Sequence, residues 1–346
     1  MATPSTLTAD LRRLVLRVEA DLMARIPVQD GVEERWREEY DTARSVGRTA
    51  TTWEQWSGSR VTQAAVAHVL ATVFVRFCED NGLIRQVWIA GPDGRTKQAV
   101  DAQHAYLREQ TRAGLDVTDR EWLIESILYL ADLPATADMF RIQVNPLWQI
   151  AMSGDMATEV LGFWRDEDET GRLRRSFVDP ALDTRFLGDL YQDLSESARE
   201  QYALLQTPEF VEEFILDLTL TPALAERPLD GFRLIDPTCG SGHFLLGAFD
   251  RLHEAWQRHA PALEPQARVQ KVLDAVHGVD INPFAVAIAQ FRLIVAALRV
   301  TGRRSLEDAP GYRLNLAPGD SLVYGRIERR ERPTLGMGSE HDVTLH

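Results

Sequence analysis

The segment Phe232-Arg-Leu-Ile-Asp-Pro-Thr-Cys-Gly-Ser-Gly-His-Phe244 decides the fold of this chain. Its first five residues form a short apolar run that ends in a carboxylate, which predicts a β-strand over 232–236. The pair of glycines in Gly240-Ser-Gly242 predicts a tight turn, and the apolar spacing that follows predicts a helix over 243–259. A glycine loop at the amino end of a helix lets a ligand approach bare backbone, and its free N–H groups favour a negative group there.

Two more strands are predicted, and each is followed or ended by a carboxylate. The strand over 276–280 ends in Asp280, which comes after a full crossover helix and can accept hydrogen bonds from both hydroxyls of a ribose. The strand over 312–316 leads to Asp320. Ligands of open α/β sheets bind at this edge. Aspartate is also common in turns, so a structural turn and a ligand contact are equally favoured for Asp320.

The remaining pattern predicts two domains of different class. Amphipathic helices fill residues 1–180, and the charged, Gly- and Pro-containing end of that stretch is typical of a solvated connector. From about residue 201, strands alternate with helices, which implies parallel strands with right-handed crossovers. We therefore predict an α + α/β chain. A helical N-terminal domain (1–180) and a connector (181–200) precede the first half of a doubly wound, Rossmann-like sheet (201–346).

The composition is that of a folded protein that does not wrap DNA by itself. Of 346 residues, 45% are hydrophobic, and the net charge is −14. Phosphate binding needs clustered Lys and Arg, so most contacts with any DNA would come from regions outside this chain. Cys78 and Cys239 lack ligand or disulfide spacing, so no metal site is expected. We find no signal peptide or membrane-span pattern and expect a cytoplasmic protein without a membrane partner.

Four short motifs, in this order and spacing, resemble the N6-adenine-specific DNA methyltransferases in which the cofactor motifs precede the catalytic one. The motifs are LLQTPEFV (204–211), IDPTCGSGHF (235–244), GVDINPFAVAIAQFRL (278–293) and GDSL (319–322). The helical stretch TWEQWSGSRVTQAAVAHVLATVFVRFCEDNGLI (52–84) looks like the front of the PglX-type methyltransferases of phage growth limitation and bacteriophage exclusion (BREX) systems.

This resemblance implies a cofactor, a substrate and a set of contact residues. The methyl donor would be S-adenosyl-L-methionine and the substrate double-stranded DNA, with other phage-defence proteins as further partners. Thr207 and Pro208 would lie over the methionine end of the cofactor, Asp280 would hold the ribose, and Asp320 would meet the adenine amino group. Gln206 departs from the aromatic residue often found before Thr-Pro. The expected cofactor contacts are Thr207, Pro208, Asp236, Pro237, Gly240, Gly242, Phe244, Asp280, Ile281 and Asp320.

The catalytic motif of that family is missing from this sequence. Transfer to an exocyclic amine needs a polar side chain and a carbonyl to hold the amine, and an aromatic face to stack the flipped base. The family supplies them from an Asn/Asp-Pro-Pro-Tyr/Phe sequence, which does not occur here. Asn145-Pro-Leu-Trp148 and Asn282-Pro-Phe284 lack the second proline, and we expect Asn282 to cap a helix. We therefore predict no catalytic residue in this chain, which would be inactive alone.

Other functions are weighed against this one. In a restriction enzyme with a nuclease in residues 1–180, the common nuclease motif needs an acidic residue two positions before its lysine. Arg95 precedes Lys97 and Val269 precedes Lys271, which excludes that motif. A methyltransferase subunit of a restriction-modification enzyme stays open, as does a non-catalytic module that senses cofactor and recruits proteins. His243 is expected to cap or pack rather than bind ligand, and Cys239 to be a small packed residue.

Overall fold

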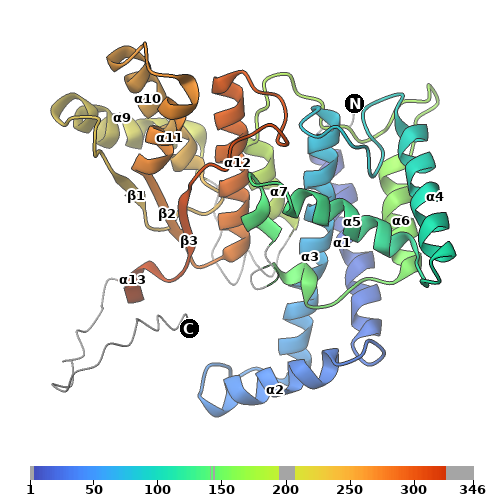
Figure 1. Ribbon diagram of the computed structural model, residues 1–346. Helices are drawn as coiled ribbons and strands as arrows, with labels where there is room; N and C mark the ends of the chain where they lie inside the picture. Colours follow the sequence, from blue (N-terminus) through green and yellow to red (C-terminus); the bar gives the residue numbers. More distant parts are fainter. Residues whose placement is uncertain (1–3, 141, 143–144, 195–206, 325–346) are drawn as a thin grey trace, which may run out of the picture.

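The structure is a computed structural model that describes residues 4–140, 142, 145–194 and 207–324 (Figure 1). Most of these residues are helical, and three short strands form one parallel sheet. The helices are α1 (Pro4–Arg25), α2 (Val32–Ser45), α3 (Trp53–Asp80), α4 (Thr96–Arg112), α5 (Asp119–Ala131), η1 (Ala137–Phe140), η2 (Pro146–Trp148), α6 (Gly154–Arg165), α7 (Arg185–Leu194), α9 (Glu209–Glu226), α10 (His243–His259), α11 (Pro265–Ala275), α12 (Pro283–Thr301) and α13 (Ser321–Tyr324). The strands are β1 (Leu234–Asp236), β2 (Val276–Asp280) and β3 (Asn315–Pro318).

Helix α3 is the central helix of the N-terminal part. A capping box of Thr52 and Gln55 starts it, and it ends just before Asn81-Gly82, a pair that favours a helix end. Every residue of its second half, from Ala64 to Asp80, is buried. Helices α1, α5 and α7 pack around it. The apolar stripe seen in the sequence is therefore the core of the helical part.

The end of α3 carries a buried charge network that fixes the following loop. The Glu79 carboxylate accepts backbone N–H groups from Trp88, Ile89, Ala90 and Gly91 at 2.5–3.2 Å. Arg76, also fully buried, donates to Glu79 at 2.6 Å and to Asp80 at 2.7 Å. A buried charge is tolerated when it is paired and hydrogen-bonded, as here. The network is structural and lies outside the predicted cofactor site.

The three strands form a parallel sheet in the order β1-β2-β3, which confirms the predicted parallel strands. The third strand starts later than the predicted 312–316, because the N–H of Arg313 donates to Gln270 of α11 and not to β2. Helix α11 itself was not predicted. Its Val269, Val272 and Leu273 are buried, and the helix packs against both α10 and β2.

Helices cover one face of this small sheet. Gly278 and Leu316, neighbours in the register, are buried, whereas Ile235 on the opposite face is 62% exposed. Strand β1 is an edge of the described sheet. The arrangement is therefore a helical part joined to a three-stranded parallel sheet. The doubly wound form of a complete sheet stays a prediction.

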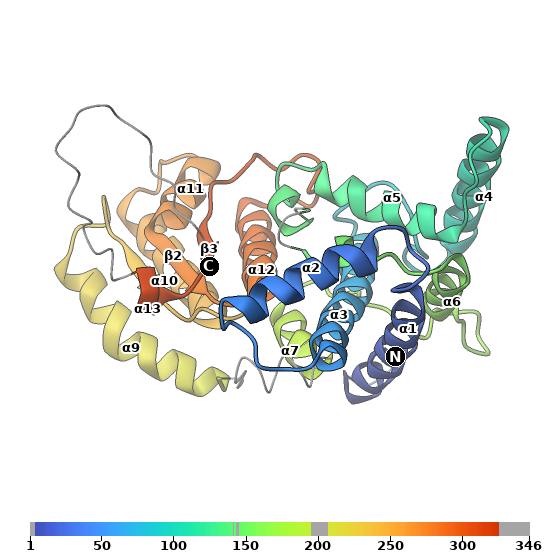
Figure 2. The same cartoon turned by 90° about the horizontal axis from the view of Figure 1, so that it is seen from below.

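Helix α12 joins the two parts, and it lies between them in Figures 1 and 2. One of its faces, which includes Phe291, belongs to the core of the helical part, where the ring lies 5.1 Å from Phe74 and 5.9 Å from Phe77. Its other face, which includes Ala289 and Leu293, belongs to the core of the sheet. A helix that is apolar all round is expected to be buried on all sides.

The apolar core thus continues across the predicted domain boundary. Helix α7 lies within the predicted connector, and its Leu187, Leu190 and Leu194 are buried. Within the stretch expected to be solvated, Leu173 and Phe177 are buried too. The rest of the connector, 195–200, lies outside the described residues, and the division into domains stays a prediction.

Two helices, α3 and α12, are long and apolar enough to cross a membrane by length and composition. However, 89% and 83% of their most apolar windows are buried inside the protein. This burial is typical of core helices.

Candidate functional site

The three predicted acidic strand ends lie at one edge of the sheet. Asp236 ends β1 and Asp280 ends β2, and Asp320 follows β3 by two residues. The N–H of Gly319 donates to the Asp280 carbonyl at 2.8 Å, which ties the second and third strand ends together. Burial raises the pKa of Asp236, and the nearby Asp280 charge raises it further. The structure therefore brings these three residues together at the edge where open α/β sheets bind ligands.

The glycine loop is closed by hydrogen bonds to the second strand. The Cys239 N–H donates to the Val279 carbonyl at 2.9 Å, and the Gly240 N–H donates to Asp280 Oδ2 at 2.8 Å. Asp280 Oδ1 accepts the Asn282 N–H at 2.9 Å. Asp280 thus holds the glycine loop in place, a role that the sequence did not predict. Since each carboxylate oxygen has a second lone pair, both oxygens retain the capacity to accept a ribose hydroxyl.

The two loop glycines have different reasons to be glycine. Both have positive φ, 52° at Gly240 and 85° at Gly242. A Cβ on Gly242 would lie 2.9 Å from the Ala289 Cβ of α12, so this residue permits close helix packing. A Cβ on Gly240 would meet nothing within 4 Å. Gly240 therefore faces open space, as expected where a ligand approaches the backbone.

The other predicted contacts surround this loop or the helix that follows it. Thr207 and Pro208 lie at the amino end of α9, where the Pro208 carbonyl accepts the N–H groups of Val211 and Glu212. Glu212 in turn packs against Gly247 of α10. Pro237 is exposed in the loop, and Ile281 is 58% exposed just after Asp280. Phe244 is half-buried and packs against the apolar cluster of α9. Gln206 lies outside the described residues.

Residues expected to be structural are structural. Asn282 Oδ1 accepts the Phe284 N–H at 3.0 Å and starts α12, and Asn145 Oδ1 accepts the Leu147 N–H at 3.1 Å and starts η2. Cys239 is buried, and burial raises the pKa of its thiol. His243 lies in the first turn of α10, with Nε2 at 3.7 Å from Asp189 Oδ1, and burial lowers its pKa to about 4. Neither of the two near matches to the catalytic motif lies free to bind a base.

Sequence reasoning missed Arg292. Its side chain is fully buried in α12, and Nη1 donates to the Ser241 carbonyl in the middle of the glycine loop at 2.7 Å. The signal was present, because Arg292 is the one charged residue in the apolar run from Pro283 to Leu298. A charge in such a run is rarely buried without a specific partner.

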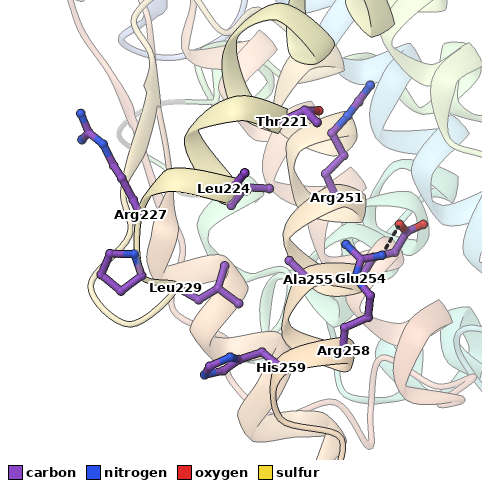
Figure 3. Close-up of a pocket in the computed structure, with 11 residues that line it drawn as sticks. Thr221, Leu224, Arg227, Leu229, Arg251, Glu254, Ala255, Arg258 and His259 are labelled. Carbon is purple, nitrogen blue, oxygen red and sulfur yellow. Dashed lines mark ion pairs between the residues drawn. The ribbon is translucent and has the colours of Figure 1, made fainter.

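A separate groove lies between the second halves of α9 and α10 (Figure 3). It encloses about 650 Å³ and is lined by Leu224, Arg227, Arg251 and Arg258, among others. Its lining includes no predicted cofactor contact, and α10 runs away from the glycine loop toward it. The groove is therefore not the predicted cofactor site. Within the part of the chain that the structure describes, no group of three His, Cys, Asp or Glu side chains is arranged to hold a metal ion.

Residues 222–316 match the family model described as the DNA-methyltransferase domain of MmeI. The chain is 50% identical over 332 residues to the adenine-specific methyltransferase PglX of Streptomyces coelicolor, a match that covers 93% of this chain and 27% of that protein. The predicted resemblance to PglX is confirmed, and the comparisons support a methyltransferase role.

Two further similarities are more distant. The chain is 23% identical over 312 residues to RM.MjaORFECS2P of Methanocaldococcus jannaschii, a putative type II restriction enzyme and methyltransferase, with 72% of this chain and 26% of that protein covered. The structure of the type IIL restriction-modification enzyme MmeI in complex with DNA matches with a TM-score of 0.38 and 16% identity, over 84% of this chain and 40% of that one. The chain spans about a quarter of the length of the curated relatives it matches.

Proposed function

We propose that the edge formed by the ends of β1, β2 and β3 is the S-adenosylmethionine site of a site-specific DNA adenine-N6 methyltransferase. The observation that carries the proposal is the placement of Asp236, Asp280 and Asp320 around a loop in which Gly240 faces open space. The similarity to an adenine-specific methyltransferase supports the choice of reaction.

The residues at this edge fit that cofactor. Asp280 would accept the ribose hydroxyls with its remaining lone pairs, while it continues to hold the Gly240 N–H. Asp320 would accept from the adenine amino group, and Ile281, which is exposed beside Asp280, would cover the adenine ring. Thr207 and Pro208 would close the methionine end. When bound, the cofactor supplies an electrophilic methyl group, and the residues of this chain bind and orient it.

DNA and partner proteins are proposed for the whole protein. With a net charge of −14, this chain would leave most phosphate contacts to regions outside it. By its resemblance to PglX, we place the protein in a BREX- or Pgl-like phage-defence system in the cytoplasm. Since no Asn/Asp-Pro-Pro-Tyr/Phe sequence occurs, the 346 residues would bind cofactor without transferring the methyl group.

Calorimetric titration with S-adenosylmethionine and S-adenosylhomocysteine tests the proposal. Asp280→Ala removes a charged hydrogen-bond acceptor, which costs about 1.5–3 kcal/mol, so the affinity should fall about 10- to 100-fold. Asp101→Ala, which changes an exposed aspartate of α4, is the matched control and should leave the affinity unchanged. Equal affinity of both variants and the unaltered chain would refute the assignment of Asp280.

A methyltransferase part of a restriction-modification enzyme is the second candidate, favoured by the similarity to RM.MjaORFECS2P. Both candidates bind the same cofactor at the same edge. Incubation of unmethylated DNA with the full-length protein separates them, because only a restriction-modification enzyme would cleave it.

A further inference from the structure

Helix α7 of the N-terminal part lies directly against the glycine loop, Gly240-Ser-Gly242, which is the cofactor loop of the proposed function. A Cβ on Gly188 would come within 2.9 Å of Arg292 Nη1 and 3.1 Å of Ser241 Cβ, and closer still to Ser241 Oγ. Real Cβ atoms essentially never make contacts shorter than 3.0 Å. Gly188 is therefore the residue that lets α7 approach both the loop and the arginine that holds it.

Arg292 ties the loop at its least constrained point. Ser241 stands between two glycines of positive φ, so the backbone there has more conformational freedom than ordinary residues allow. The bond from Arg292 Nη1 to the Ser241 carbonyl is charged and fully buried, and such bonds are the stronger kind. Within the described residues, Arg292 Nε and Nη2 have no hydrogen-bond partner, so the side chain is oriented by Ser241, through its carbonyl at 2.7 Å and, more weakly, its hydroxyl at 3.4 Å.

The charges around Arg292 come from two helices, α7 and α9. Asp189 of α7 is the acidic group that most favours the charged form of Arg292, whose pKa burial lowers to about 10. Arg185 of α7 opposes that charge, and Glu212 of α9 favours it. Asp189 also lies 3.7 Å from His243 in the first turn after the loop. Helix α7 thus contributes both the steric and the electrostatic surroundings of the arginine.

We propose that Arg292 is a positioning residue and that α7, through Gly188 and Asp189, sets its position, so that the N-terminal helical part controls the order of the cofactor loop and thereby cofactor affinity. The effect on affinity rests on the proposed function. The effect on loop order does not, because it follows from contacts within the chain.

The test changes the fit of α7 without touching a predicted cofactor contact. Gly188→Ala should displace Ser241 and Arg292. Ser241→Ala removes the hydroxyl, which is the atom nearest to the new methyl group, and keeps the carbonyl that Arg292 binds. The double variant should therefore recover in part, because the 2.9 Å approach to Arg292 Nη1 remains. Gly162→Ala is the matched control, because this exposed helical glycine has nothing within 4 Å of an added Cβ.

Hydrogen exchange of the ligand-free chain is the first readout. The amides of Cys239, Gly240 and Gly242 are hydrogen-bonded within the loop and to Asp280 and Val279. We expect Gly188→Ala to speed their exchange at least tenfold relative to Gly162→Ala, with partial recovery in the double variant and no change in α3. Exchange equal to that of Gly162→Ala would overturn the proposal, as would equal acceleration throughout the chain without recovery, which means general unfolding.

Calorimetric titration with S-adenosylmethionine is the second readout. Gly188→Ala should weaken binding about tenfold or more, and the double variant should restore it in part. Normal affinity together with normal exchange would overturn the proposal. If the unaltered chain binds no cofactor, the proposed function fails, while hydrogen exchange still decides whether α7 orders the loop.

Discussion

The two loop glycines provide a sharp test of the site, because the same substitution should have different effects two residues apart. In Gly242→Ala, the new Cβ would lie 2.9 Å from Ala289 Cβ and 3.3 Å from its Cα, which is backbone of α12 and cannot swing away. Overpacking of this kind costs typically about 1–3 kcal/mol. The positive φ of 85° adds about 1–2 kcal/mol for a residue with a Cβ. We expect the free energy of unfolding to fall by about 2–5 kcal/mol.

Gly240→Ala should cost only the free energy of a positive φ in a residue with a Cβ, because its Cβ would meet nothing within 4 Å. The free energy of unfolding should therefore fall by only about 1–2 kcal/mol. The added methyl group would instead project into the open space over the loop. We expect affinity for S-adenosylmethionine to fall at least about tenfold, which is about 1.4 kcal/mol.

Denaturant unfolding measures the first quantity and calorimetric titration the second, on the unaltered chain and both variants. The reasoning about packing is refuted if Gly242→Ala is no more destabilising than Gly240→Ala. The reasoning about the ligand is refuted if Gly240→Ala binds cofactor as the unaltered chain does. The two results are independent, so either half can fail alone.

Further predictions concern stability and turnover. Burial holds the pKa of His243 near 4, below about 6.5 in an unfolded chain, so its neutral form stabilises the fold fully above pH 6.5 and that contribution is lost as the pH falls to 4. The free energy of unfolding, measured across this pH window, should fall by about 3 kcal/mol through the titration of His243, which lies between Asp189, Arg185 and Arg292. The variant His243→Gln should no longer show this loss. Glu79→Ala should cost about 3–5 kcal/mol in the same assay, since it leaves four buried N–H groups without their acceptor and removes one of the two carboxylates that Arg76 binds, Asp80 being the other; a loss below 1 kcal/mol would contradict this. The chain incubated with labelled cofactor and DNA should form no N6-methyladenine, and turnover would reveal a catalytic group that the sequence does not show.

The sequence predicted the sheet edge well because its signals are local. A short apolar run that ends in a carboxylate, followed by a glycine turn, specifies a strand end and a loop within a dozen residues, and the limits of α10 and β2 agree with those predicted. The start of β3 was missed because a side chain of α11 takes the N–H of Arg313, a contact 43 residues away in sequence. The role of Asp280 in holding the Gly240 N–H, beside its predicted role as a ribose ligand, was missed for the same reason, since Gly240 is 40 residues away in sequence.

The relation between the helical part and the sheet follows from α12. Its apolar residues form two stripes at helical spacing: one, with Ile288, Phe291 and Val295, packs into the helical core, and the other, with Ala289 and Leu293, packs into the core of the sheet. Both cores include residues of this helix, because one stripe is buried by the helical part and the other by the sheet and its helices. Arg292 stands between the stripes and reaches the glycine loop. Because packed interiors resist compression, we expect this helix to transmit a displacement of either core to the glycine loop.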